Sequence, residues 1–326
     1  MARIYLTREI PEGGIAMLEE EHELDVYRGD EPPAKQEIIE HVNDAEGLLC
    51  LLTDPIDREV LDAAPHLRAI STYAVGYDNI DVGEATRRGI PIGHTPGVLT
   101  ETTADLAWAL LMAAARRIPE GDDMVRRGDF KGWGPKVLLG SDVYGKTLGI
   151  IGAGRIGQAM ARRAMGFDMD ILYHSRTRKP SFEAECNARY VELDELLAAA
   201  DYVTLHVPLT DDTYHLIGQA ALAAMKDTAY LVNTARGECV DEAALVTALK
   251  NGDIAGAALD VFEHEPALTE GLASLDNVVL APHAGSASIE TRTEMAEIAA
   301  SNLLVGLRGE TPRYCVNPEA LEQKTG

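Results

Sequence analysis

A glycine-rich turn near the middle of the sequence leaves few folds open to this chain. Gly152-Ala153-Gly154-Arg155-Ile156-Gly157 follows the apolar run TLGII and opens the helical pattern IGQAMARRA. In a strand–turn–helix of this kind, the first glycine permits a tight turn, the second lets the backbone approach a pyrophosphate, and the third lets the helix pack on the sheet. The helix N-terminus then faces the anion. The motif therefore predicts a dinucleotide-binding turn; the alternative is a glycine-rich turn that binds no ligand.

Apolar runs alternate with helical patterns on both sides of this turn. Strands separated by helices imply βαβ units and parallel sheets. The 326 residues allow about two domains. We expect an α/β fold in which the second set of strands forms a doubly wound domain of roughly 180 residues. The predicted strands are Arg3–Thr7, Gly47–Leu52, Arg68–Thr72, Ile90–Gly93, Thr147–Ile151, Asp170–His174, Tyr202–Pro208, Ala229–Thr234, Gly256–Val261 and Asn277–Pro282.

Two long helical patterns do not belong to this alternation. ETTADLAWALLMAAARR keeps apolar residues at helical spacing and is expected to end near Pro119. Residues 119–146 are then interpreted as loops with short helices, because glycine and proline recur there. The last pattern, Ser288–Arg308, predicts one more long helix, which lies too far along the chain to extend the second sheet and is interpreted as returning to the first domain.

The charge of the chain excludes some classes of partner. The sequence holds 53 acidic and 29 basic side chains, a formal net charge of −24. Phosphate backbones require basic patches, so nucleic acid is not an expected partner, and an anionic membrane surface is excluded on the same ground. The basic residues are 8 lysines and 21 arginines. This acidic, lysine-poor composition fits either adaptation to high salt or a genome that favours arginine and alanine codons.

The cysteines and the N-terminus point to a soluble protein of a reducing compartment. Cys50, Cys186, Cys239 and Cys315 are scattered and form no Cys-x-x-Cys pair, so neither a disulfide framework nor a metal site is expected. The N-terminal segment carries charges where a signal peptide needs an apolar core. The longest apolar helical stretch, Leu106–Ala115, is too short to cross a bilayer. We therefore expect a cytoplasmic protein.

The strand after the glycine turn ends in a segment that bears on coenzyme choice. An NAD enzyme places Asp or Glu there to bind the ribose 2′-hydroxyl. Here the strand DILYH leads into Ser175-Arg176-Thr177-Arg178-Lys179, which offers two hydroxyls and three cations and no carboxylate. These groups suit a 2′-phosphate, so NADP(H) is the predicted coenzyme, with NAD(H) possible. The alternative is a basic turn that only faces solvent.

Three further segments follow successive predicted strands, where open α/β sheets bind ligands. They are VNTARG around Arg236, LDVFEHEP around Glu265 and APHAGS around His283. Together with GAGRIG they resemble the D-isomer-specific 2-hydroxyacid dehydrogenases. TREIPEGGI, YAVGYDNID, TPGVLTETTADLAWALL and DVYGKTLGIIGAGRIGQA resemble the glyoxylate/hydroxypyruvate reductase branch, so the resemblance covers essentially the whole chain.

The resemblance implies a catalytic trio. His283 is the implied proton donor, Glu265 its partner and Arg236 the substrate-binding arginine. In such a reaction, hydride leaves the nicotinamide for the substrate C2 carbonyl, whose oxygen then needs a proton; a histidine supplies one near neutral pH. An arginine offers a rigid fork to the substrate carboxylate. Taken singly, the three residues could instead be a strand-end histidine, a surface carboxylate and a structural ion-pair partner. The neighbouring Glu263 and His264 are not selected.

The resemblance also implies further contacts. In GDFKGWGP, Trp133 resembles a tryptophan that reaches the substrate pocket, from a partner subunit in this dimeric family; the alternative is an aromatic packed under its own loop. The sequence departs from the resemblance here, since the loop Gly128–Pro135 looks a few residues shorter than in similar members of the family. Leu52, Val75 and Gly76 are implied to contact substrate. The glycine turn and Ser175, Arg176 and Thr177 are implied to contact the coenzyme. The resemblance implies six further coenzyme contacts: Thr103, His206, Thr234, Ala235, Asp260 and Gly285.

The family architecture implies a discontinuous, flavodoxin-like substrate domain, 1–98 with 289–326, and a Rossmann coenzyme domain, 99–288. The activity expected is NADPH-dependent reduction of glyoxylate or hydroxypyruvate to the D-2-hydroxy acid by a homodimer. A broad-range 2-ketoacid reductase is the first alternative, and a dinucleotide-sensing regulator of the same fold is the second. Phosphoglycerate dehydrogenase is disfavoured because the chain has no room for a regulatory domain, and formate dehydrogenase because formate chemistry needs no proton donor.

Overall fold

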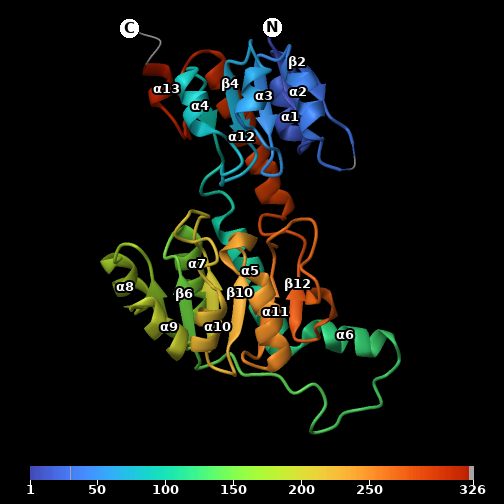
Figure 1. Cartoon of the computed structure of the whole chain (residues 1–326), viewed down its shortest axis with the longest axis vertical. Coiled ribbons are helices and arrows are strands. Elements are labelled where there is room, and N and C mark those ends of the chain that lie inside the picture. Colours follow the sequence, from blue (N-terminus) through green and yellow to red (C-terminus); the bar gives the residue numbers. More distant parts are fainter. Residues whose placement is uncertain (30, 323–326) are drawn as a thin grey trace. The chain divides into compact units, whose positions relative to one another are not determined.

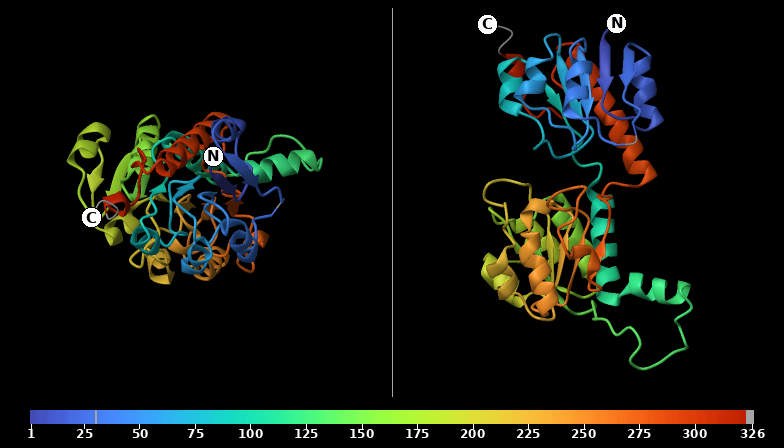
Figure 2. Two further views of the ribbon diagram at one scale, coloured as in Figure 1. Left: turned by 90° about the horizontal axis from the view of Figure 1, so that it is seen from above. Right: turned by 45° about the vertical axis from the view of Figure 1, so that its right-hand side comes forward.

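The apolar runs of the sequence form two separate parallel sheets. The computed structural model describes residues 1–29 and 31–322, and its contacts divide the chain into two units. Unit 1 consists of Met1–Leu99 and Ala287–Gly326, and unit 2 of Thr100–Ser286. Each unit has helices on both faces of its own sheet (Figures 1 and 2). The predicted class, two doubly wound α/β domains, is confirmed.

The sheet of unit 1 has the strand order β2-β1-β3-β4-β5, and all its strands are parallel. This is the flavodoxin-like order, in which the chain reverses direction across the sheet beside the first strand. The two strands GLLC and AIST are buried throughout, as expected for central strands covered on both faces. The strands are β1 (Arg3–Leu6), β2 (Glu23–Val26), β3 (Gly47–Cys50), β4 (Ala69–Thr72) and β5 (Ile92–Gly93).

The helices of unit 1 form one layer on each face of this sheet. The first core contains α1 (Glu12–Glu19) and α12 (Ile289–Leu307), which pack on each other and on the sheet. Ser288 begins α12, since its hydroxyl accepts a hydrogen bond from the Thr291 N–H at 3.1 Å. The second core lies on the opposite face and contains residues of α2 (Lys35–Val42), α3 (Arg58–Asp62) and α4 (Val82–Arg87). The last helix of the unit is α13 (Glu319–Glu322).

The sheet of unit 2 has the order β12-β11-β10-β9-β6-β7-β8, again all parallel. Counted from β6, this is the Rossmann order 3-2-1-4-5-6 with one more strand, and the direction reverses between β6 and β9. The strands are β6 (Thr147–Ile151), β7 (Asp170–His174), β8 (Arg189–Tyr190), β9 (Tyr202–Leu205), β10 (Tyr230–Asn233), β11 (Gly256–Leu259) and β12 (Val278–Leu280).

Two helical layers also cover this second sheet. One core contains residues of α5, α7 and α8, and the other contains residues of α9, α10 and α11. Figure 1 shows these last three helices together over one face of the sheet. The helices of unit 2 are α5 (Thr100–Arg116), α6 (Ile118–Arg126), α7 (Arg155–Met165), α8 (Pro180–Cys186), α9 (Leu193–Ala199), α10 (Gln219–Ala224) and α11 (Glu242–Asn251).

Some elements differ from the sequence-based expectation. The edge strands β2 and β8 were not predicted, because one is polar and the other has two residues. The first long helix ends at Arg116, and after Arg117 at φ 53° a second helix, α6, begins. Pro119 lies in the first turn of α6, where a backbone N–H has no acceptor inside the helix, so proline is tolerated there. Pro119 therefore follows the end of α5 and also lies at the start of α6. Within the described residues, no helix is both apolar and long enough to span a bilayer.

Candidate active site

The glycine turn lies at the carboxyl end of β6, where the strand order of unit 2 reverses. Gly152 has φ +99°, and a Cβ there would lie 2.5 Å from the His206 carbonyl oxygen on the loop after β9. A side chain is therefore excluded both by the backbone angle and by the neighbouring loop. At Gly157 a Cβ would lie 2.2 Å from the Gly152 oxygen, so α7 packs directly on the turn. The loops after β6 and β9 are thus held together at the position where such sheets bind ligands.

The middle glycine of the turn has space beside it. Gly154 has φ −77° and ψ −166°, and no atom lies within 4 Å of the position that its Cβ would occupy. Arg155 and Ile156 follow as the first residues of α7, whose N–H groups have no acceptor inside the helix. The Ala153 carbonyl accepts a hydrogen bond from the Gln158 amide at 3.0 Å, which holds the turn in place. An open cradle at a helix N-terminus fits a pyrophosphate.

The turn after β7 is polar and largely exposed. The Ser175 hydroxyl donates a hydrogen bond to the Thr177 carbonyl at 2.7 Å, which closes the turn. Arg176 and Thr177 are exposed. Arg178 instead forms an ion pair with Glu183 of α8. The turn therefore presents hydroxyls and cations to solvent, and one of its cations already has a carboxylate partner.

Two buried polar atoms at the carboxyl edge of the unit 2 sheet lack a partner within residues 1–29 and 31–322. They are His206 Nδ1, on the loop after β9, and Thr234 Oγ1, at the end of β10. Burial lowers the pKa of His206 to about 3, so its ring is neutral near pH 7 and is not a proton donor. Ala235, next to Thr234, donates its N–H to the Asn233 side chain at 3.0 Å. Unsatisfied buried polar atoms are uncommon, and a bound coenzyme would supply partners here.

Asp260 organises the loop that carries the histidine. It is 1% exposed, and its carboxylate accepts the Ala284 N–H at 2.7 Å, while its carbonyl accepts the His283 N–H at 2.8 Å. Burial raises the pKa of Asp260, against the effect of the hydrogen bonds from the loop. A Cβ at Gly285 would lie 3.3 Å from both Asp260 Oδ2 and Thr103 Cγ2. The structure thus brings Thr103, Asp260 and Gly285 together.

His283 and Glu265 form a hydrogen-bonded pair. His283 Nδ1 lies 2.9 Å from Glu265 Oε2, and the other carboxylate oxygen accepts the Phe262 N–H at 3.0 Å. Burial alone would raise the pKa of Glu265, but the hydrogen bond and charge of His283 outweigh it, and the pKa is lowered. His283 has φ +52°, an uncommon angle for a residue with a side chain. Because Nδ1 is engaged by Glu265, the other ring nitrogen, Nε2, is the one available for chemistry.

Arg236 follows β10 on a loop that touches the Glu265 loop. Its Nη1 donates to the Ala235 carbonyl at 2.8 Å, and its own carbonyl accepts the Asn233 side-chain amide at 2.8 Å. A Cβ at Gly237 would lie 1.9 Å from the Phe262 carbonyl carbon, so the two loops are in direct backbone contact there. The charge of Arg236 also contributes to the lowered pKa of Glu265. The three predicted catalytic side chains therefore lie on neighbouring loops at the carboxyl edge of one sheet.

Three further predicted substrate contacts lie in unit 1. Leu52 is in the loop after β3, and Val75 and Gly76 are in the loop after β4, so all three lie at the carboxyl edge of that sheet. Asp54, which is fully buried, shapes the first loop: its carboxylate accepts the Leu51 N–H at 2.6 Å and the hydroxyl of Thr7, after β1, at 2.5 Å. The loop after β3 lies where the strand order of unit 1 reverses, between β1 and β3.

Comparisons with known proteins agree with this arrangement. A family model described as D-isomer specific 2-hydroxyacid dehydrogenase, NAD binding domain, matches residues 108–285, more than half of the chain. A glyoxylate reductase of Korarchaeum cryptofilum is 58% identical over 322 residues, which are 98% of this chain and 97% of the relative. The chain belongs to the D-isomer-specific 2-hydroxyacid dehydrogenase family. It is an oxidoreductase whose coenzyme is a nicotinamide dinucleotide, and the family predicted from the sequence is confirmed.

Solved structures of other proteins share both units. A crystal structure of a Thermus thermophilus protein matches with a TM-score of 0.91 and 47% identity, covering 96% of this chain and 99% of that chain. A Sinorhizobium meliloti protein, described as an NADPH-dependent glyoxylate/hydroxypyruvate reductase in complex with NADP and malonate, matches with a TM-score of 0.86 and 35% identity, covering 98% of each chain. Both matches support the assignment of this chain to the dehydrogenase family.

Trp133 lies on a segment that extends away from the sheet of unit 2. Helix α6 has no buried residue, and the chain after it continues through an exposed loop (Figure 2). We call residues 118–141 the arm. Trp133 is 88% exposed, which excludes the alternative that it packs beneath its own glycine-rich loop. Other large apolar side chains of the arm are also exposed: Ile118, Val125, Phe130, Val137 and Leu139.

Several residues that support the site are not among those predicted from its sequence motifs. Asp54 shapes the loop of Leu52, and Glu183 holds Arg178. Glu242, which is 1% exposed, accepts the Glu263 N–H at 3.0 Å, and Glu263 accepts a hydrogen bond from His215. Asp54, Glu242 and Glu263 support segments that are distant in the sequence, and no local pattern marks such pairings. Glu183 is close to Arg178 in the sequence, but no motif indicates that the two side chains pair.

Proposed function

We propose that this enzyme reduces a small 2-keto acid, glyoxylate or hydroxypyruvate, to the D-2-hydroxy acid with NADPH. The observation that carries the proposal is the His283–Glu265 pair, at 2.9 Å, beside Arg236 at the carboxyl edge of a Rossmann sheet. The names of relatives support the substrate class: the Korarchaeum protein is called a glyoxylate reductase.

His283 acts as the proton donor to the substrate oxygen. Its Nδ1 is held by Glu265, so Nε2–H of the imidazolium is the group that faces the reacting carbonyl. When bound, the reduced nicotinamide supplies hydride to the carbonyl carbon. Glu265, kept ionised by its lowered pKa, stabilises the positive ring before transfer and fixes its orientation afterwards. In the reverse direction the neutral ring accepts the proton.

Arg236 binds the substrate carboxylate and polarises the ketone. Its planar fork matches a carboxylate with two parallel hydrogen bonds, and its charge stabilises the developing alkoxide. Val75 and Gly76 supply backbone N–H groups to the same carboxylate, and Leu52 forms an apolar wall that favours a small substituent. Unit 1 then serves as the substrate-binding domain and unit 2 as the coenzyme-binding domain.

The coenzyme contacts follow from the fit of unit 2 to a dinucleotide. The glycine turn, from Gly152 to Gly157, takes the pyrophosphate, and Ser175, Arg176 and Thr177 take the 2′-phosphate of NADPH. Thr234 Oγ1 and His206 Nδ1, which are buried and have no hydrogen-bond partner within the described residues, form hydrogen bonds with the coenzyme. Thr103 is a further ligand of the pyrophosphate, Thr234 and Asp260 face the nicotinamide, and Ala235 and Gly285 are further coenzyme contacts. The exposed hydroxyls and cations after β7 support NADPH over NADH.

The arm supports a homodimer. Its apolar side chains are exposed in a single chain, and helix α6 has no residue buried. Exposed apolar surface of this kind marks an interface between proteins. We propose that the arm packs against a second copy and that Trp133 reaches the partner's substrate pocket. Light scattering should give twice the chain mass, and Trp133→Ala should raise the KM for the keto acid.

We expect the enzyme to act in the cytoplasm. Two measurements test the proposed activity. The first is a matrix of kcat/KM values for glyoxylate, hydroxypyruvate and larger 2-keto acids, each with NADPH and NADH. The second compares His283→Ala with the control His264→Ala, an exposed histidine beside the pair. We expect His283→Ala to lower kcat by about a hundredfold to ten-thousandfold with an unchanged Kd for NADPH. Unchanged turnover would remove His283 from the mechanism.

A further inference from the structure

We propose that Arg178 favours NADPH by neutralising Glu183, and not by binding the 2′-phosphate itself. The inference rests on the proposed NADPH preference and deepens it. The turn after β7 has no carboxylate in its own sequence, but Glu183 of α8 brings one to it through the ion pair with Arg178. Arg178 is therefore a residue that determines specificity through another side chain.

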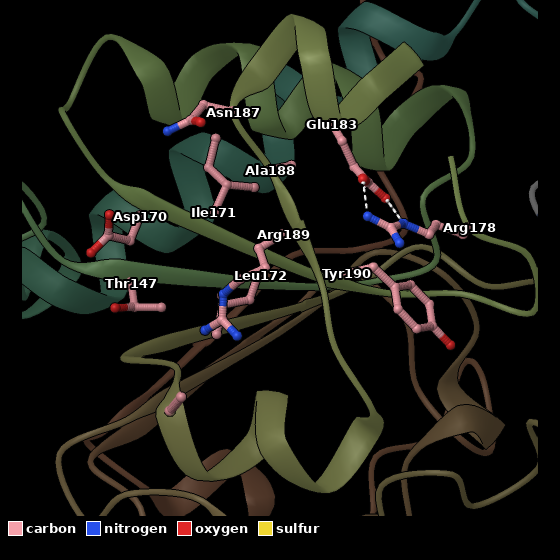
Figure 3. A pocket seen from close by; sticks show the side chains of 11 residues that line it. Thr147, Asp170, Ile171, Leu172, Arg178, Glu183, Asn187, Ala188, Arg189 and Tyr190 are labelled. Carbon is pink, nitrogen blue, oxygen red and sulfur yellow. Dashed lines mark hydrogen bonds and ion pairs between the residues drawn. The ribbon is translucent and has the colours of Figure 1, made fainter. Parts of the chain in front are cut away.

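The Arg178–Glu183 contact is bidentate. Arg178 Nε lies 2.7 Å from Glu183 Oε1, and Nη2 lies 2.8 Å from Oε2. Figure 3 shows this pair facing a pocket at the edge of the sheet beside β8, with Tyr190 close by and Arg189 also on its wall. A planar arginine fork on a carboxylate is a strong and well-directed contact. Glu183 therefore occupies one edge of the guanidinium, formed by Nε and Nη2.

Glu183 is also fixed from the side of the sheet. The hydroxyl of Tyr173, a fully buried residue of β7, donates to Glu183 Oε1 at 2.6 Å and accepts the Lys179 N–H at 2.7 Å. The carboxylate has only 17% of its side chain exposed. The pKa of Glu183 is lowered to about 2, first by the hydrogen bond from Arg178 and then by that from Tyr173, so the group is ionised near pH 7. The Glu183 carboxylate cannot move away from the turn without breaking its hydrogen bonds with Tyr173 and Arg178.

A fixed carboxylate at this turn conflicts with a 2′-phosphate. A phosphate monoester carries about 1.5 to 2 negative charges at neutral pH. An unpaired Glu183 would repel it, as the acidic residue of an NAD enzyme does. Arg178 cancels that charge. Arg176 and Lys179 form no ion pair within the described residues, so they remain as the cations that bind the phosphate. Loss of Arg178 therefore exposes a repulsive charge rather than removing a ligand.

The test is a double-mutant cycle read by direct binding. The selectivity, Kd for NADH divided by Kd for NADPH, is measured by coenzyme fluorescence for the wild type, Arg178→Ala, Glu183→Gln and the double variant. We expect Arg178→Ala to lower the selectivity about fivefold to tenfold, and the double variant to return to within about twofold of the wild type. Glu183→Gln should leave the selectivity equal or raise it, because Arg178 is then released. If Arg178 binds the phosphate directly, the double variant stays as low as Arg178→Ala.

A matched control separates local from global charge. Arg189, an exposed arginine on the wall of the same pocket, pairs with Glu195 at 2.6 Å. Arg189→Ala removes the same charge and should leave the selectivity unchanged; an equal fall would overturn the inference. Thermal unfolding of each variant checks the fold, and Arg178→Lys should retain part of the selectivity. A wild-type selectivity below 1 would refute the proposed NADPH preference, whereas the change on substitution judges the role of Arg178 separately.

Discussion

Substitution of Gly154 separates coenzyme binding from folding. Its φ and ψ lie in a region open to any residue, and no atom lies within 4 Å of its Cβ position. A Cβ at this position therefore meets no neighbouring atom in the folded chain. Gly154 is the N-cap of α7, and valine is a poorer N-cap residue than glycine, which lowers the free energy of unfolding by about 1 kcal/mol. For a unit of this size that lowers Tm by about 2–4 °C.

Coenzyme binding should respond far more strongly to the same change. The valine side chain fills the cradle in front of α7, so a pyrophosphate loses at least one charge-assisted hydrogen bond, worth about 1.5–3 kcal/mol. The Kd for NADPH should then rise between about tenfold and a hundredfold. Fluorescence titration measures it. Wild-type affinity in Gly154→Val would show that the pyrophosphate does not bind at this turn.

Gly152→Ala is the matched control, with the opposite expectation. The angle of +99° costs about 1–2 kcal/mol for a residue with a side chain. A Cβ at 2.5 Å from the His206 carbonyl oxygen forces a backbone shift, which costs a further ~1–3 kcal/mol. The free energy of unfolding should fall by the sum, and Tm by roughly 5–15 °C. If both variants unfold like the wild type, the packing of the β6 and β9 loops is not as described.

Three further predictions concern charge. The pKa of Glu265 is lower in the folded than in the unfolded chain, so its pair with His283 stabilises the fold at pH values above the ordinary carboxylate pKa. This stabilisation is lost as the pH falls through the lowered pKa of the folded state. Urea unfolding from pH 6 to pH 3 should show the loss in the wild type and not in Glu265→Gln. Arg236→Lys loses the bidentate fork and should raise the keto-acid KM about tenfold or more in steady-state kinetics. Because the chain carries a net charge of −24, stopped-flow association of NADPH should accelerate as salt rises from low to physiological strength; a fall would mean that local cations dominate.

The sequence could predict the parts of the fold that depend on local pattern. GLLC, TLGII and GAAL are apolar runs long enough to be buried strands, and all three are strands in the structure. The glycine turn was recognisable because its three glycines serve three different backbone requirements within six residues. The family and the two α/β domains were predicted for the same reason: their motifs lie at strand ends, and strand ends are visible in the sequence.

The support of the site depends on contacts that no local pattern reveals. The turn after β7 looks wholly cationic in the sequence, yet the structure pairs Arg178 with a glutamate from the next helix. Likewise Pro119 suggested a helix end, whereas the left-handed angle of Arg117 lets a second helix begin at once. Neither feature has a periodic signal: the sequence does not show that Arg178 turns toward Glu183, or that the backbone of Arg117 is left-handed.

An acidic chain that binds anionic ligands must treat near and distant carboxylates differently. At physiological ionic strength the Debye length is about 8 Å, so exposed carboxylates beyond that distance contribute little to the potential at a bound phosphate. A carboxylate at the coenzyme turn is not screened in this way, and Glu183 is such a group. The chain does not remove it; Tyr173 uses it to anchor the turn, and Arg178 cancels its charge. The net charge of −24 is therefore compatible with an anionic coenzyme, and the Arg178–Glu183 pair limits the repulsion of a 2′-phosphate at this turn.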